Sequence, residues 1–353
     1  MKSEIILPQI EISRTLPSNY SAPRTVLKKT AEVKLIDFGK AYVNLNNLIF
    51  RGLRFMRESR PDFPKSFYRL QKLLVHLYFK SKIIDMKDMP VLVIADGYSP
   101  YFSHWMCDNL VRAYLVKKHY KNDFKIVLPK IFYESNFCLE TLEMIGISKE
   151  RVIKFDKREA VTSNHIIFPT FILGGGGPTT TYDSVTIEVA NTILDHCKNN
   201  GGLNFSLGER IFISRSKQKK RIILNQAEVD KVLSKYGFTT VHMEHFSFAE
   251  SVAIAHNAKV IVSQCGSNLT NVMFCQAGTK ILELYPRKEY DDLPGAIMIA
   301  EASQAFNLEH FYQYCEVDKT NMYLNEFHTD QIVDVVEFEA NIKKILSGIS
   351  NSD

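Results

Sequence analysis

The second half of the chain alternates short apolar runs with segments of helical character, and this alternation limits its possible folds more than any other feature. The apolar runs have the length of buried strands and lie at residues 210–214, 239–243, 259–263 and 280–285. A capping box, Ser247 with Glu250, begins one of the helical segments between them. Strands that alternate with helices in this way predict a parallel, doubly wound sheet.

The first half shows a weaker form of the same alternation. Residues 91–95 are continuously apolar, as expected of a buried parallel strand, and a helix is predicted from about 104 to 120. The polar and glycine residues at 199–202 follow another predicted helix and form the best candidate linker. A length of 353 residues also suits two domains better than one.

We therefore predict an α/β fold of two doubly wound domains that face each other across a cleft. The expected parts are a first α/β domain at 1–200, a second domain at 203–328, and a C-terminal helix within 329–353 that returns to the first domain. This final helix is expected from about residue 331 to 346, where apolar residues recur at helical spacing.

Composition excludes several classes of protein. An apolar fraction of 45% and a charged fraction of 24% are those of a folded globular chain, not of a disordered one or a coiled coil. The apolar runs are too short for a membrane-spanning helix, and the first residues lack the apolar stretch of a secretion signal. The six cysteines form no C-x-x-C pair, so we expect no zinc site and reduced thiols in a cytoplasmic protein.

Positive charge gathers in residues 51–82, which carry nine basic residues and two acidic ones. This segment thus contributes +7 to the net charge of +5, and the remaining chain carries −2. Because aromatic residues are interleaved with the basic ones, an anionic membrane surface is one expected partner. An amphipathic helix with a solvated face is the alternative. We expect no nucleic-acid partner, since the segment contains no known reading motif.

Ligands of open parallel sheets bind beyond the carboxyl ends of the strands. Directly after the first apolar run, Arg215, Lys220 and Arg221 belong to a cationic segment that suits a diphosphate; a solvated basic loop is the alternative. After the third run comes a loop of small residues that opens a helix and offers backbone N–H groups to an anion. Its candidate binding residues are Gly266, Ser267, Asn268, Thr270 and Asn271. The alternative is the turn and cap that any parallel strand needs here.

Two further positions carry candidate chemistry. Glu283 interrupts an apolar run, so we expect it at the end of its strand, where a carboxylate accepts hydrogen bonds from ribose hydroxyls; an internal salt bridge is the alternative. In the first half, His104 and Asp108 lie four residues apart on a predicted helix and share a face. A carboxylate beside an imidazole can remove a proton from a hydroxyl. The alternative is an aspartate that only favours the positive end of the helix dipole.

The ordered motifs of residues 90–290 resemble glycosyltransferase family 61. The motifs are Tyr101-Phe102-Ser103-His104-Trp105-x-x-Asp108, Ser214-Arg215, Arg221-x-x-x-Asn225, Phe248-x-Glu250, Leu269-Thr270-Asn271 and Leu282-Glu283-Leu284. The resemblance implies two Rossmann-like domains of the GT-B type, with the nucleotide-sugar held mainly by the second. It also implies inverting transfer with no cofactor and no essential metal. The chain departs from the family at Cys265-Gly266-Ser267-Asn268, where the family has His-Gly-Ala-Gly, and at Ser251, where it has Gln.

The resulting hypothesis is a cytoplasmic glycosyltransferase, peripheral on the inner membrane face. It moves a sugar from a nucleotide-diphosphate sugar to a glycan or lipid-linked glycan hydroxyl in the synthesis of bacterial surface polysaccharide, such as capsule or lipopolysaccharide. Asp108, supported by His104, is the expected base. The alternatives are a non-catalytic nucleotide- or glycan-binding protein and another polysaccharide-modifying enzyme such as a pyruvyltransferase.

Overall fold

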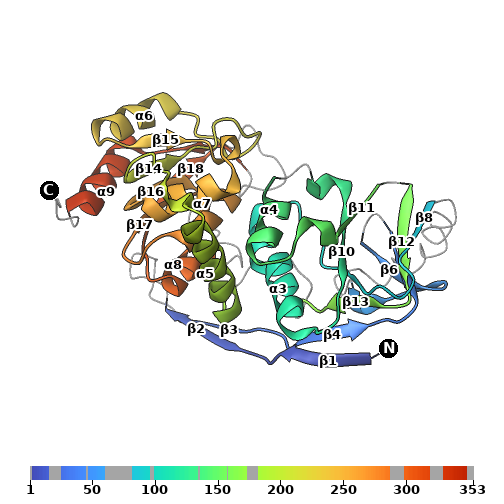
Figure 1. Cartoon of the computed structure of the whole chain (residues 1–353). Helices are drawn as coiled ribbons and strands as arrows, with labels where there is room; N and C mark the ends of the chain where they lie inside the picture. Colours follow the sequence, from blue (N-terminus) through green and yellow to red (C-terminus); the bar gives the residue numbers. More distant parts are fainter. Residues whose placement is uncertain are drawn as a thin grey trace. The chain divides into compact units, whose positions relative to one another are not determined.

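A computed structural model of the chain describes residues 2–15, 25–44, 47–59, 82–95, 99–133, 136–156, 158–172, 182–286, 298–318 and 329–347 (Figure 1). The chain divides into two compact units. The first comprises Met1–Ser13 and Leu27–Ile193, and the second comprises Arg14–Val26 and Leu194–Asp353. The division falls inside helix α5 (Ser184–Asn199), ahead of the predicted linker at 199–202.

The first unit is built around a six-stranded sheet with the order β1-β4-β13-β9-β10-β11. Its strands are β1 (Lys2–Leu7), β4 (Val33–Asp37), β13 (Ile166–Pro169), β9 (Val91–Leu92), β10 (Lys125–Pro129) and β11 (Val152–Phe155). The last four are parallel to one another, whereas β1 and β4 are antiparallel additions. The parallel strands run through a buried apolar core, because their side chains are covered on both faces.

A five-stranded sheet in the first unit was not predicted. Its order is β7-β6-β5-β12-β8, and its strands are β5 (Ala41–Val43), β6 (Ile49–Arg51), β7 (Arg54–Phe55), β8 (Lys82–Asp85) and β12 (Glu159–Ser163). A separate two-stranded sheet consists of β2 (Glu11–Thr15) and β3 (Thr25–Lys29). The helix proposed within the basic segment 51–82 falls on residues 60–81, which lie outside the described residues, as does the glycine run 174–177.

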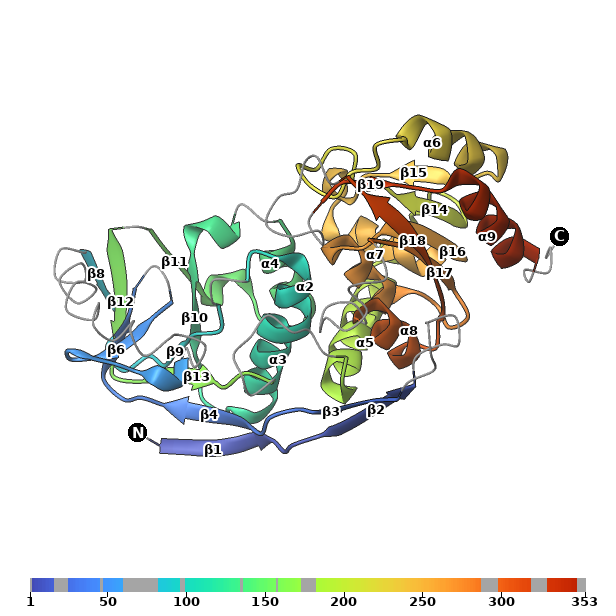
Figure 2. The same ribbon diagram turned by 180° about the vertical axis from the view of Figure 1, so that it is seen from behind.

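The predicted helix of residues 104–120 is present but changes its winding along its length. It begins as α2 (Phe102–His104), continues as the π-helical turn η3 (Trp105–Asn109) and ends as α3 (Leu110–His119); Figure 2 labels α2 and α3. The Trp105 indole donates to Thr141 Oγ1 at 2.8 Å and ties this helix to α4 (Asn136–Met144). The segment that carries the candidate base is therefore fixed in the core of the first unit.

The second unit contains the parallel sheet that its alternating pattern predicts. The strand order is β15-β14-β16-β17-β18-β19. The strands are β14 (Arg210–Ile213), β15 (Thr239–Val241), β16 (Val260–Gln264), β17 (Lys280–Pro286), β18 (Glu309–Val317) and β19 (Gln331–Ile332). The first five are parallel, and β19 is antiparallel to β18.

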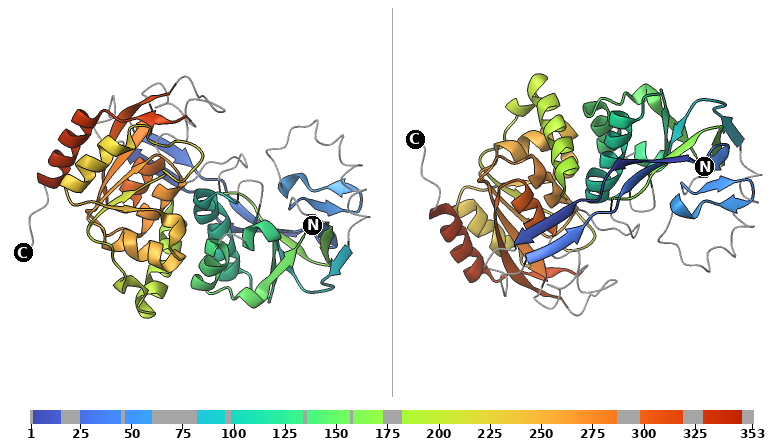
Figure 3. Two further views of the ribbon diagram at one scale, coloured as in Figure 1. Left: turned by 90° about the horizontal axis from the view of Figure 1, so that it is seen from above. Right: turned by 90° about the horizontal axis from the view of Figure 1, so that it is seen from below.

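Helices cover this second sheet. One face packs against α6 (Gln226–Lys235) and α9 (Val335–Ser347), which lie side by side in Figure 3. The other helices are α7 (Phe248–Asn257), which begins with the predicted capping box, and α8 (Met298–Ala305). Short 3₁₀ segments occupy 57–59, 130–133, 149–151, 202–204, 243–245 and 267–274.

The C-terminal helix differs from its prediction in two ways. It starts at Val335, because residues 331–332 instead extend the sheet as β19. Its contacts also lie in the second unit, where a return to the first was expected: Lys235 of α6 and the following Tyr236 both bond to Glu339 of α9, at 2.7 and 2.8 Å. The apolar side of α9 completes the core on that face of the sheet.

Among the described residues, no helix has both the length and the apolar character to cross a bilayer.

Candidate active site

Two arginines of the second unit converge on one glycine. Arg215 follows the end of β14, and Arg221 Nη1 donates to the backbone oxygen of Cys265 at 3.1 Å. A Cβ atom on Gly266 would lie 2.6 Å from Nη1 of Arg215 and 3.6 Å from Nη1 of Arg221. The structure therefore brings together three residues predicted to bind a diphosphate, and the absence of a side chain at Gly266 leaves room for the Arg215 guanidinium beside Arg221.

Arg215 is a buried cation whose charge has little local compensation. Only 9% of the residue is exposed, and among the described residues its Nε has no hydrogen-bond partner. Burial first, and the positive charge of Arg221 second, lower the pKa of Arg215 to about 10. The side chain is still protonated at neutral pH. Because the two arginines are both positive and cannot neutralise each other, this position favours the binding of an anion.

The remaining predicted residues of this site divide into two groups. Lys220, Ser267 and Asn268 are half-buried at its margin. Thr270 and Asn271 are buried within the 3₁₀ helix η8 (Ser267–Phe274), and Asn271 Nδ2 donates to the backbone oxygen of Asn268 at 2.9 Å. The expectation of a loop extending to residue 271 is thus wrong, because the chain begins to wind directly after Gly266.

Glu283 does not lie at the end of its strand. It is inside the seven-residue strand β17, all of which is buried, and its side chain is 2% exposed. Its Oε2 accepts a hydrogen bond from Nε2 of His310 on β18 at 3.1 Å. The structure thus contains an internal Glu283–His310 pair of the kind given as the alternative prediction, and a ribose contact through Oε2 would require this oxygen to leave His310.

His310 is a site residue that sequence reasoning missed. It lies in the edge-proximal strand β18, 27 residues after Glu283, and no local motif surrounds it. The only available signal was Glu283 itself, because a carboxylate within a buried strand needs a partner from a neighbouring element.

Asp108 of the first unit has a partner that was not predicted, Arg112. Its Oδ2 accepts hydrogen bonds from Nε and Nη2 of Arg112, at 3.0 and 2.7 Å. Arg112 also donates to two backbone oxygens: that of Ile94, which follows strand β9, and that of Pro169, which ends strand β13. Asp108 therefore stands at the carboxyl edge of the first sheet, where ligands of such sheets bind.

His104 lies one turn before Asp108, and its ring packs edge-on against Tyr101 with centroids 6.1 Å apart. Asp108 lies inside the π-helical turn, which begins directly after His104. Isolated π-helical turns within α-helices occur frequently at functional sites. The π-helical turn thus favours a functional role for Asp108. The support of Asp108 by His104 stays a prediction.

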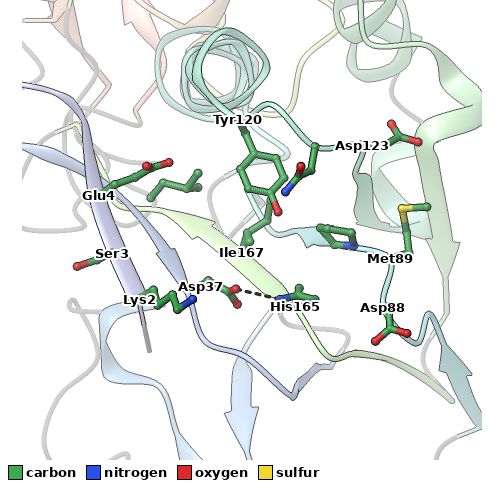
Figure 4. Close-up of a pocket in the computed structure, with 13 residues that line it drawn as sticks. Lys2, Ser3, Glu4, Asp37, Asp88, Met89, Tyr120, Asp123, His165 and Ile167 are labelled. Atoms are coloured by element: carbon green, nitrogen blue, oxygen red, sulfur yellow. Dashed lines mark hydrogen bonds and ion pairs between the residues drawn. The ribbon is translucent and has the colours of Figure 1, made fainter.

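A separate pocket of about 800 Å³ lies at the opposite, amino-terminal edge of the first sheet (Figure 4). It contains none of the predicted site residues. Three of its carboxylates already have partners: Asp37 Oδ2 lies 3.0 Å from Nδ1 of His165, and Asp88 and Asp123 accept from Asn164 and Arg151. Among the described residues that line this pocket, none has a buried side-chain polar atom without a hydrogen-bond partner.

Within the parts of the chain that the structure describes, no three His, Cys, Asp or Glu side chains are grouped so that they could hold a metal ion.

Comparison with known proteins points to one family. The model of the family Glycosyltransferase 61 matches residues 102–282, just over half of the 353 residues. The matched part includes Asp108, Arg215, Arg221 and Gly266, and it ends one residue before Glu283.

Curated relatives match a shorter part of the chain. The protein O-linked-mannose β-1,4-N-acetylglucosaminyltransferase 2 of Homo sapiens and that of Mus musculus are each 34% identical over 83 residues. The Xenopus laevis protein of the same name is 31% identical over 93 residues. These matches cover 23–24% of this chain and 14–16% of the relatives' own length. On the extent of the family match, the chain belongs to glycosyltransferase family 61.

Proposed function

We propose that the chain is an inverting glycosyltransferase that needs no metal and transfers a sugar from a nucleotide-diphosphate sugar to a glycan or lipid-linked glycan hydroxyl. Membership of the family supports the reaction class. The observation that carries the donor assignment is the buried Arg215, with no described partner for its Nε, beside Arg221 and over Gly266. A diphosphate supplies the negative charge that this position lacks.

The same two arginines have a role in the reaction itself. Negative charge grows on the diphosphate as its bond to the anomeric carbon breaks, and the bonding electron pair goes to the phosphate oxygen. Guanidinium groups already held in place stabilise that charge without reorganisation. In this proposal Arg215 and Arg221, with Lys220 at the margin, supply the positive charge that a metal ion supplies in other transferases.

On the acceptor side, we assign the general base to Asp108. The acceptor oxygen attacks the anomeric carbon from the face opposite the diphosphate, and the Asp108 carboxylate takes its proton. Arg112 fixes the carboxylate through two hydrogen bonds to Oδ2. A base held in this way contributes on the order of 10²–10⁴-fold to the rate.

The finer assignments extend this proposal. The two units would be the two Rossmann-like domains of the GT-B type, since each contains a core of parallel strands. N-acetylglucosamine is the first sugar to test, because the relatives' name specifies its transfer. We retain synthesis of a bacterial surface polysaccharide in the cytoplasm as the proposed setting.

The membrane surface remains part of the proposal through the charge of residues 51–82. Flotation with vesicles of phosphatidylcholine and phosphatidylglycerol at low salt tests it. Binding that disappears at high salt is expected, and no binding at low salt would remove the membrane partner from the proposal.

The substitution Asp108→Asn tests the assignment of the base. We expect kcat to fall about 10²–10⁴-fold, while the dissociation constant of the nucleoside diphosphate stays unchanged. Asp195→Asn, an exposed aspartate on α5, is the matched control and should retain full activity. Retention of most transfer activity in Asp108→Asn would show that another group is the base.

A donor panel tests the reaction class. Nucleotide release should depend on an acceptor and persist in EDTA, and the product should have the anomeric configuration opposite to that of the donor. Cys265, in place of the family's histidine, favours one competing function, a non-catalytic nucleotide-binding protein. Calorimetric binding without turnover across the donor and acceptor panel would support that alternative.

A further inference from the structure

A buried acid–imidazole pair lies in the two strands next to the arginine site. Glu283 of β17 and His310 of β18 have side chains that are 2% and 1% exposed, and their Oε2 and Nε2 atoms are 3.1 Å apart. A carboxylate removed from water is unfavourable unless it is paired and hydrogen-bonded. The position of the Glu283 carboxylate therefore depends on His310.

Glu283 in turn lies close to Cys265, the residue before Gly266. Burial and the nearby Glu283 carboxylate raise the pKa of the Cys265 thiol, so the thiol remains protonated and can donate to that carboxylate. The backbone N–H of Cys265 donates to the oxygen of Leu284 at 2.9 Å. Cys265 is thus attached to β17 through both its backbone and its side chain.

Cys265 is the last link before the arginines. Its backbone oxygen accepts from Arg221 Nη1 at 3.1 Å, and the next residue, Gly266, makes the close approach to Arg215. A continuous series of contacts therefore leads from His310 through Glu283 and Cys265 to both guanidinium groups. A shift of Cys265 would move the backbone oxygen that accepts from Arg221, and it would also move Gly266, which lies against Arg215.

We infer that His310 is a positioning residue for the diphosphate site: it holds Glu283, Glu283 holds Cys265, and Cys265 sets the place of Arg221 and Arg215. This inference rests on the proposed function, because the diphosphate at these arginines belongs to that proposal. His310 itself is enclosed and touches no ligand in this arrangement.

The test compares affinity with stability in variants of the full chain. The probes are inorganic pyrophosphate and UDP, measured by calorimetry, together with the melting temperature. His310→Ala should lower the affinity for both probes about tenfold. This is the lower end of the usual loss when a contact that supports a binding residue is removed. His310→Gln keeps an N–H donor and should restore most of that affinity.

A matched variant separates this role from a general effect on folding. His256 lies in the same unit, at the end of α7, and its Nδ1 is 3.1 Å from the backbone oxygen of Phe274. His256→Ala should lower the melting temperature without changing the affinity for pyrophosphate. If His310→Ala behaves in the same way, with lower stability and wild-type affinity, the inference is overturned.

A double-mutant cycle tests the route through Cys265. Cys265→Ala should weaken pyrophosphate binding, and adding His310→Ala should cause little further loss, because both act through the same contacts. Wild-type affinity in Cys265→Ala would overturn the proposed route even if His310→Ala does not fold. Failure of the wild-type protein to bind either probe would instead overturn the proposed donor site, and the inference with it.

Discussion

Arg112 of the first unit and Arg215 of the second are both buried and both lie near the carboxyl ends of parallel strands, but their surroundings are opposite. Arg112 is 0% exposed and bonds to the Asp108 carboxylate and to two backbone oxygens. Its guanidinium also lies 4.5 Å from the ring centroid of Phe171. Arg215 has a second arginine beside it and, in the described chain, no acceptor for its Nε.

The difference shows that burial alone does not reveal what an arginine does. Arg112 has its donors satisfied by its own unit, so it stabilises the fold and orients the candidate base. Burial removes water from Arg215, and its Nε gains no hydrogen-bond acceptor in exchange. An anion from outside the chain would therefore explain its position. The first arginine should matter for stability and the second for binding.

Replacement of Arg112 should produce the largest effect on stability. Arg112→Met leaves Asp108 and two backbone oxygens without their donor, so we expect the free energy of unfolding to fall by about 3–5 kcal/mol. Urea unfolding measures this loss. Arg151→Met is the matched control, because its pair with Asp123 is exposed and should contribute about 1 kcal/mol or less. Equal losses in the two variants would contradict the role given to Arg112.

Arg215→Met should show the reverse behaviour. Two hydrogen bonds from a charged group to pyrophosphate would be lost, so affinity should fall about 100-fold. The free energy of unfolding should stay the same or rise, because a buried charge is replaced by an apolar chain of similar length.

Arg210→Met, at the start of the strand that precedes Arg215, provides the comparison, since Arg210 Nη1 is bonded to the backbone oxygen of Tyr236 at 2.8 Å. This variant should lose some stability and keep its affinity for pyrophosphate. A stability loss in Arg215→Met as large as that in Arg112→Met would mean that both arginines are structural.

Gly266→Ala should have a smaller effect on the same site. The new methyl group would lie 2.6 Å from Arg215 Nη1, so the guanidinium must move. Because that atom is the end of a flexible side chain, we expect little change in stability but a loss of about tenfold in pyrophosphate affinity, equivalent to about 1.4 kcal/mol. In an Arg215→Met background the substitution should cost much less, and an undiminished loss there would show that the methyl group acts elsewhere.

The sequence predicted the sheet of the second unit well because its strands are buried on both faces and are therefore continuous apolar runs. It also placed Arg215 and Arg221 at one site, since both follow the end of a strand in such a sheet. The five-stranded sheet of the first unit was missed because strands of two to five residues leave no periodic pattern.

Long-range pairing accounts for the errors at the site. The apolar run around Glu283 favoured a position at the strand's end, since nothing nearby in the sequence shows the histidine that makes a buried carboxylate tolerable. Arg112 was within reach of sequence analysis, because it is four residues from Asp108, but its bonds to Ile94 and Pro169 depend on the folded sheet. The π-helical turn at 105–109 similarly has no signal in a helical periodicity.

The smallest predicted effect is the pH dependence of anion binding. The pKa of Arg215 is lowered from 12.5 to about 10 in the free protein, and the protonated form is the one that binds. As pH rises through about 10, half of the molecules lose this proton, so affinity for ADP should fall about twofold at pH 10 and further above it. Between pH 10 and 12.5 the unfolded chain binds more protons, so the Arg215 contribution to the free energy of unfolding should rise with pH. Calorimetry with ADP should show this fall in affinity in the wild type. The fall should be smaller in Arg215→Met, where only lysines and other groups titrate. The same pH dependence of affinity in both proteins would contradict a lowered pKa at Arg215.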